Sequence, residues 1–236
     1  MSERRRWVAV VVFGAAMAWM ESATVVYLRM LVGRVNPYQL NPLPRHDALG
    51  NTELVREAAT LAMLVAVGWL AGRNGRTRLC YSLIAFGAWD ILYYVFLAMI
   101  VGWPQSLLDW DVLFLIPLPW WGPVIAPAMI AALMIVGGTL VTQFGVTQLG
   151  DACFWPRRWS LALNAAGIVL ALVVFMQDSI RALSGGEAAI RATLPARFNW
   201  TWFAVALAMM SCAILDLLWQ MRGRRASYAA SAAAAD

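Results

Sequence analysis

The chain has 236 residues, of which 62% are hydrophobic and 13% are charged, and its net charge of +5 comes from arginine because it contains no lysine. A water-soluble globular protein typically carries about 25% charged residues, so this composition excludes that class and predicts a polytopic membrane protein. The lack of lysine also excludes a retinal or pyridoxal Schiff base and a P-loop lysine.

Six segments are long and apolar enough to cross a membrane core about 30 Å thick as helices. They are residues 7–32, 54–71, 79–102, 123–145, 159–177 and 200–221. We therefore predict an all-α protein with six transmembrane helices in one domain over residues 1–225. The alanine-rich segment 226–236 is of low complexity, and we expect a disordered cytoplasmic tail there.

The arginines are distributed unevenly between the ends of these spans. Eleven of the eighteen lie at the two termini and in the segments 73–78 and 157–158, whereas six lie in the longer loops at the opposite ends of the spans. The positive-inside rule then predicts that both termini are cytoplasmic, in a membrane of the bacterial inner-membrane type. The basic start followed by a long apolar run predicts an uncleaved signal anchor.

A proline- and tryptophan-rich segment, residues 103–122, precedes the fourth span. Pro117 and Pro119 lie inside it, and each removes a backbone donor and crowds the preceding turn, so a regular helix is excluded there. We expect a short re-entrant or interfacial element on the outer face. It is either a lid or wall over a cavity that opens outward, or a loop that rests on lipid headgroups.

Acidic side chains inside the apolar spans are the main functional signal. Glu21 lies in the first span, Glu57 at the outer end of the second and Asp90 near the middle of the third, within FGAWDILYY. A charge in mid-membrane costs roughly 2.5–3.5 kcal/mol, so such residues usually face the bundle interior. Because the first and third spans run outward and the second runs inward, the three carboxylates are expected to form the core of one outward-facing pocket.

Three further residues are second choices for this pocket: Tyr94, one turn after Asp90, and His46 and Asp111 near its mouth. The pocket suits the binding or translocation of a cation, a proton or a small solute. An alternative is an embedded metalloenzyme holding iron, manganese or zinc through Glu21, His46, Glu57 and Asp90. A third reading is a structural or assembly subunit, in which Arg29, Arg56 or a tyrosine hydroxyl satisfies the acids.

Other function classes lack their signatures. Neither a G-x-G-x-x-G nor a Walker motif is present, so we expect no nucleotide, and the short arginine clusters beside the spans favour membrane orientation over nucleic-acid binding. The acidic groups concentrate in the first half of the chain, which argues against an inverted-repeat transporter. The expected partners are the lipid bilayer and either a second copy of the chain or another membrane protein.

Overall fold

The computed structural model describes the chain except for residues 32, 34–35, 39–47, 146–153, 196 and 234–236. The elements, in chain order, are α1 (Glu3–Leu31), α2 (Ala48–Ala71), α3 (Gly75–Val101), β1 (Trp110–Val112), β2 (Trp121–Pro123), α4 (Ile125–Thr139), the π-helix η1 (Leu140–Gly145), α6 (Arg158–Arg181), the 3₁₀ turn η2 (Ala182–Gly185), α7 (Gly186–Ala192) and α8 (Trp200–Ala233).

The predicted set of apolar helices is confirmed. Within the described ranges, six helices have the length and composition to cross a membrane. They are Glu3–Leu31, Gly50–Ala71, Gly75–Val101, Ile125–Phe144, Arg158–Ala192 and Trp200–Gly223. The fifth runs beyond the predicted end at residue 177, because η2 and α7 continue it. Helix α8 continues to Ala233, into the segment for which we expect disorder; alanine has the highest intrinsic helix propensity.

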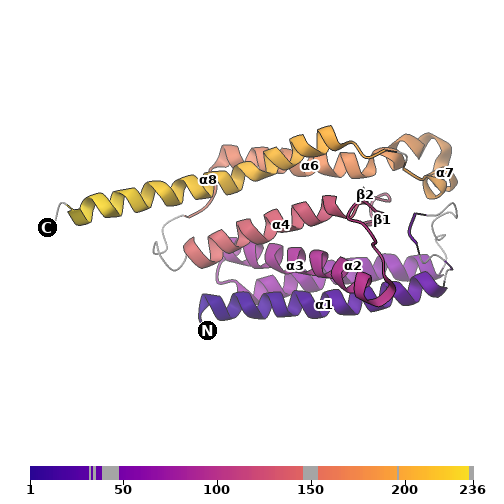
Figure 1. Ribbon diagram of the computed structural model, residues 1–236, viewed down its shortest axis with the longest axis horizontal. Helices are drawn as coiled ribbons and strands as arrows, with labels where there is room; N and C mark the ends of the chain where they lie inside the picture. The colour runs from indigo at the N-terminus through magenta and orange to yellow at the C-terminus, as the bar shows by residue number, and fades with distance from the viewer. Residues whose placement is uncertain (32, 34–35, 39–47, 146–153, 196, 234–236) are drawn as a thin grey trace.

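The helices run side by side along the long axis of the molecule (Figure 1). Both chain termini lie toward one end, called here the terminal end, and the strands β1 and β2 lie with α7 toward the other, called the hairpin end. Helix α3 is central and packs against α1, α2 and α4, whereas α6 and α8 pack mainly on each other. Helix α8 contacts α4, and α6 contacts strand β2. These contacts connect the α6–α8 pair to the rest of the molecule.

Close approach of helices to α3 depends on small residues. A Cβ atom on Gly87 would lie 2.6 Å from the carbonyl oxygen of Ala131 in α4, and one on Gly68 would lie 2.3 Å from the amide nitrogen of Ser82. Without a side chain, these glycines allow the backbones of α3 and its neighbours to approach each other, as is common between membrane helices. The chain thus fixes the position of α3 from two sides.

The start of α3 is set by a capping box. The side chain of Asn74 accepts a hydrogen bond from the amide of Thr77 at 3.0 Å, and the Thr77 hydroxyl accepts one from the amide of Asn74 at 3.1 Å. These bonds satisfy backbone donors that an α-helix leaves free in its first turn. The helix ends at Gly102, whose φ of 68° is the left-handed conformation that favours glycine.

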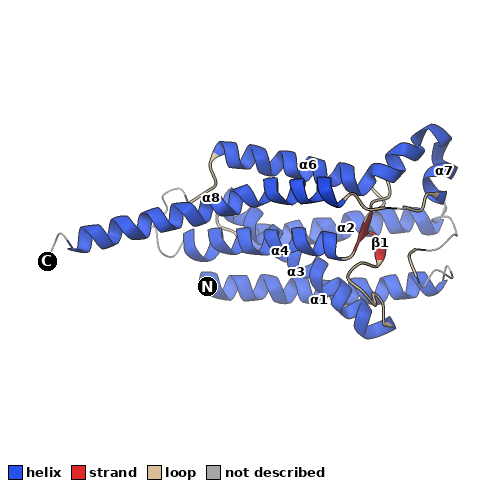
Figure 2. Cartoon of the chain, turned by 45° about the horizontal axis from the view of Figure 1, so that its top comes forward, coloured by secondary structure: helices blue, strands red, loops and turns tan. Residues whose placement is uncertain are grey.

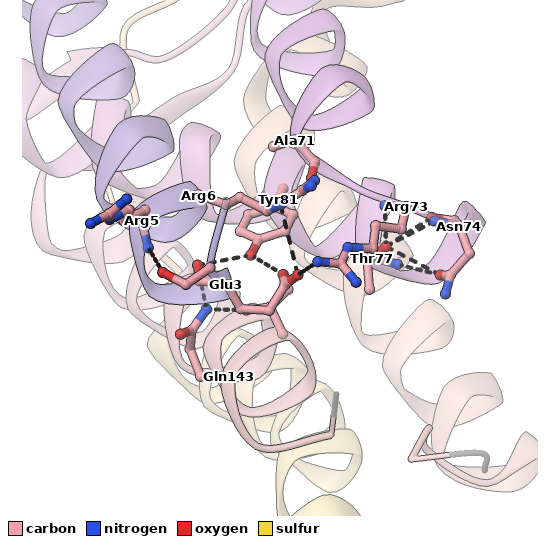
Figure 3. Close-up of polar contacts among 11 residues, drawn as sticks. Glu3, Arg5, Arg6, Ala71, Arg73, Asn74, Thr77, Tyr81 and Gln143 are labelled. Carbon is pink, nitrogen blue, oxygen red and sulfur yellow. Dashed lines mark hydrogen bonds and ion pairs between the residues drawn. The ribbon is translucent and has the colours of Figure 1, made fainter. Parts of the chain in front are cut away.

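A polar cluster ties the helices together at the terminal end (Figure 3). The buried carboxylate of Glu3 accepts a hydrogen bond from the Tyr81 hydroxyl at 2.8 Å and pairs with Arg73 at 3.1 Å. Arg6 donates to the last carbonyl of α2, and Gln143 donates to the Glu3 carbonyl at 3.3 Å. The first turn of α1 is therefore attached to the α2–α3 turn, to α3 and to η1.

The proline-rich segment forms two short antiparallel strands at the hairpin end (Figure 2). Trp110 pairs with Pro123, and Val112 pairs with Trp121. The Ser179 hydroxyl of α6 donates to the carbonyl of Pro119 at 2.7 Å, which fixes the loop between the strands against α6. The segment is non-helical, as expected from its prolines. Its placement relative to a membrane surface stays a prediction.

Candidate functional site

A cavity of about 810 Å³ lies between the helices. Side chains from α1, α2, α3, α4, α6, α7 and α8 line it, and residues 111–120 of the proline-rich segment form its wall at the hairpin end. Most of the lining is apolar, and the charged groups gather toward the hairpin end. The cavity therefore combines an apolar space of ligand size with a few converging polar groups, which is the usual composition of a small-molecule site.

The described residues of the cavity lining carry a negative charge balance. Its described charged residues are six carboxylates, Glu21, Glu53, Glu57, Asp90, Asp111 and Glu187, and three guanidiniums, Arg29, Arg56 and Arg191. With all acids ionised, three carboxylates are in excess. Charges of one sign in a low-dielectric cleft focus the field and raise the local concentration of the opposite charge.

Glu21 is neutralised by an arginine from the neighbouring helix. The guanidinium of Arg56 in α2 forms direct ion pairs with Glu21 and with Glu53, which precedes it by three residues on the same helix face. Thr60 donates a further hydrogen bond to Glu21 at 3.2 Å. One guanidinium thus serves two carboxylates, and it attaches α1 to α2 at the hairpin end.

Asp111 has its own arginine. Its carboxylate lies 3.0 Å from the guanidinium of Arg29, which also stacks 4.3 Å from the ring centre of Trp103. The Val112 amide donates to Asp111 at 2.9 Å, and the Tyr94 hydroxyl is a further hydrogen-bond partner. Burial raises the pKa of Asp111 above its usual value, and these three partners act in the opposite direction. Asp111 therefore anchors β1 to α1 and α3.

Glu57 has weaker compensation. Its side chain is buried, and it accepts one hydrogen bond, from the amide of Leu115, at 3.3 Å. In the part of the chain that the structure describes, no arginine forms an ion pair with Glu57. Arg56 interacts with it electrostatically, but that guanidinium already pairs with Glu21 and Glu53. Glu57 thus faces the cavity with most of its acceptor capacity free.

Asp90 is an acid of the cavity lining that lacks a cationic partner among the described residues. It is 8% exposed, and its buried Oδ2 has no hydrogen-bond partner in the described part of the chain. The charged group that influences it is Asp111, which carries the same sign. A buried polar atom that is left unsatisfied costs about 1–3 kcal/mol, so this arrangement persists at the expense of stability. An acid of this kind in a cavity wall is suited to bind a ligand.

The structure brings five of the predicted residues to one cavity: Glu21, Glu57, Asp90, Tyr94 and Asp111. His46 lies outside the described residues. Within the described ranges, no group of three or more His, Cys, Asp or Glu side chains is close enough to hold a metal ion. Four of the six described carboxylates of the lining form ion pairs, and the described residues offer no ion-pair partner to Glu57 and Asp90.

Sequence reasoning missed the apolar extension of the cavity and the part played by Glu53. Glu53 lies one turn before Glu57, and its helical spacing from Arg56 was the available signal. The apolar lining of α6 and α8 had no such signal, because helices that are apolar on every side do not indicate which face points inward.

Comparison of the chain with protein-family models, with curated protein sequences and with solved structures finds no match. Functional reasoning therefore depends on the cavity itself.

Proposed function

We propose that the chain is a multi-pass membrane protein that binds a small cation in this cavity, with Asp90 as the group that contacts it and Glu57 as a further acid of the same cavity. The observation that carries the proposal is Asp90 itself, a buried acid of the lining whose Oδ2 has no hydrogen-bond partner among the described residues. The described carboxylates of the cavity also outnumber its described guanidiniums by three. A ligand cation would supply the missing charge. The low-dielectric surroundings strengthen the attraction between such a cation and the two acids.

The other carboxylates have a different task in this proposal. Glu21 and Asp111 are each paired with an arginine from a different element, so they hold α1, α2 and the hairpin in place. Tyr94 contacts Asp111 and orients it. This division explains why one cavity contains both compensated and uncompensated acids. The paired acids hold the wall of the cavity in place, and the unpaired acids remain free to interact with a ligand.

The side from which the cation enters follows from the arginines. The excess of arginine at the terminal end supports cytoplasmic termini in a bacterial-type inner membrane. The cavity's charged end then faces outward, and the hairpin forms its outer wall. Binding from the outside, followed by translocation or by a change in a partner protein, is the activity that this geometry serves.

Isothermal titration of the purified protein with butylammonium tests the proposal. A hydrogen bond to a charged group contributes about 1.5–3 kcal/mol, so Asp90→Asn should weaken binding by at least about ten-fold, and Glu57→Gln, which removes a more remote charge, should weaken it less. Asp178→Asn is the matched control, because Asp178 is an acid in α6 that does not line the cavity. Unchanged affinity in Asp90→Asn, or no binding by the wild-type protein, would contradict the proposal.

A further inference from the structure

The cavity does not end at the carboxylates. On α3 its lining continues from Asp90 through Phe86 and Leu83 to Cys80. Ten residues of α-helix separate Asp90 from Cys80, which corresponds to about 15 Å along the helix axis. This extension toward the terminal end is called the apolar limb. It is too long for a small cation that is bound at Asp90.

The apolar limb is lined by matching faces of four helices. Its lining residues recur every three or four positions, as expected for one face of each helix. They include Leu83 on α3, Gly137 on α4, Ile168 on α6 and Leu217 on α8. The amide of Asn164 also lines it but already donates to the carbonyl of Met210 at 2.9 Å. The limb therefore offers contact to an apolar chain and little to a polar group.

Two residues of the lining keep exposed surface within the candidate membrane spans. Leu79 on α3 and Ile168 on α6 both line the cavity, yet they are 49% and 43% exposed. Both belong to helices that are long and apolar enough to cross a membrane, which suits a lipid-soluble ligand.

From these features we infer that the ligand is a single-chain amphiphile, whose cationic headgroup binds at Asp90 and whose tail occupies the apolar limb. This inference rests on the proposed cation site. The negative charge of the described lining favours a cationic headgroup, and the length and apolar lining of the limb favour a hydrocarbon tail.

Photoaffinity labelling tests the placement of the tail. The probes are two dodecylamines that carry a diazirine, one beside the amino group and one at the terminal carbon, together with a butylamine diazirine. With protein in lipid nanodiscs, the tail-end probe should label peptides of α3 around Leu83, α4 around Gly137 or α8 around Leu217. The head-end probe and the butylamine probe should label the hairpin end.

Position 137 offers a matched pair of variants. A Cβ on Gly137 would meet Ile214 of α8 at 3.6 Å, an ordinary contact, so alanine fits and a larger side chain grows into the limb. Overpacking of this kind usually costs enough to lower occupancy by about ten-fold. Gly137→Leu should therefore reduce labelling by the tail-end probe about ten-fold and leave butylamine labelling unchanged, whereas Gly137→Ala should change neither.

The outcomes separate the two proposals. If butylamine labels the hairpin end in an Asp90-dependent manner but the tail-end probe labels only lipid-facing peptides, the amphiphile inference is wrong and the cation site stands. Equal tail-end labelling of Gly137→Leu and the wild type would also overturn the inference. If Asp90→Asn leaves butylamine labelling unchanged, the cation site itself is wrong.

Discussion

Replacement of Asp90 by leucine should stabilise the protein. The Oδ2 atom of Asp90 is buried and has no hydrogen-bond partner in the described part of the chain, so the native state bears the cost of an unsatisfied polar group. That cost is about 1–3 kcal/mol, and Asp90→Leu removes it together with the atom that causes it. Leucine has the same number of side-chain heavy atoms as aspartate, and the adjacent cavity leaves room for its larger methyl groups. A stability gain at the expense of ligand binding is the usual result when a strained functional group is removed.

Asp111→Leu provides the contrasting variant. It removes a buried carboxylate as well, but it leaves the guanidinium of Arg29, which is only 13% exposed, without its acidic partner. Breaking one side of a buried ion pair costs about 3–5 kcal/mol. The two substitutions are chemically identical and lie in the same cavity, yet their effects on unfolding free energy should have opposite signs.

Thermal unfolding of the purified variants in one detergent measures both effects. For a chain of this size, 1 kcal/mol corresponds to roughly 2–4 °C in melting temperature. Asp90→Leu should therefore raise the midpoint by roughly 2–12 °C, and Asp111→Leu should lower it clearly. If Asp90→Leu lowers the midpoint as much as Asp111→Leu does, Asp90 has a structural partner and the reasoning is refuted.

Three further variants test the fold and the ion pairs. Arg29→Met should lower the melting temperature, and adding Asp111→Leu to it should recover part of the loss, because the double variant removes both members of this ion pair; a double variant less stable than Arg29→Met would contradict this. Gly87→Ala should reduce the folded yield and the melting temperature, since its Cβ would lie 2.6 Å from the Ala131 carbonyl; a wild-type melting curve would show that α4 packs elsewhere. Asn74→Ala should cost about 1 kcal/mol through loss of the α3 cap, read from the same melting experiment, and no change would mean that the cap is redundant.

The membrane spans followed from the sequence because their signal is local. Each needs only about twenty apolar residues in a row, and the described helices match the predicted segments to within a few residues except at the end of the fifth, which extends to Ala192. The position of Asp90 at the cavity also followed from the sequence, since a carboxylate inside a membrane span usually faces the interior of the helix bundle and not lipid. The proline-rich segment was correctly expected to be non-helical, for reasons that are also local.

The ion-pair partners of the acidic residues did not follow from the sequence, because they depend on how the helices pack. The sequence offered Arg29, Arg56 and tyrosine hydroxyls as alternatives for the acids, without deciding between them. The structure pairs Arg56 with Glu21 and Arg29 with Asp111, which leaves Asp90 unpaired. The apolar limb could not be predicted either, since it forms between four helices that are apolar on every side, and their sequences do not show which faces line it.

Cysteine modification inside the cavity tests the central claim most directly. Val25 lines the cavity and is uncharged, so Val25→Cys in a chain with its three native cysteines replaced leaves every acid in place. A cationic and an anionic methanethiosulfonate of similar size are then added to right-side-out vesicles. A negative, outward-facing cavity should accelerate the cationic reagent by ten-fold or more over the anionic one, and Asp90→Asn should reduce that ratio. Equal rates, or faster modification by the anionic reagent, would contradict a cation-binding cavity.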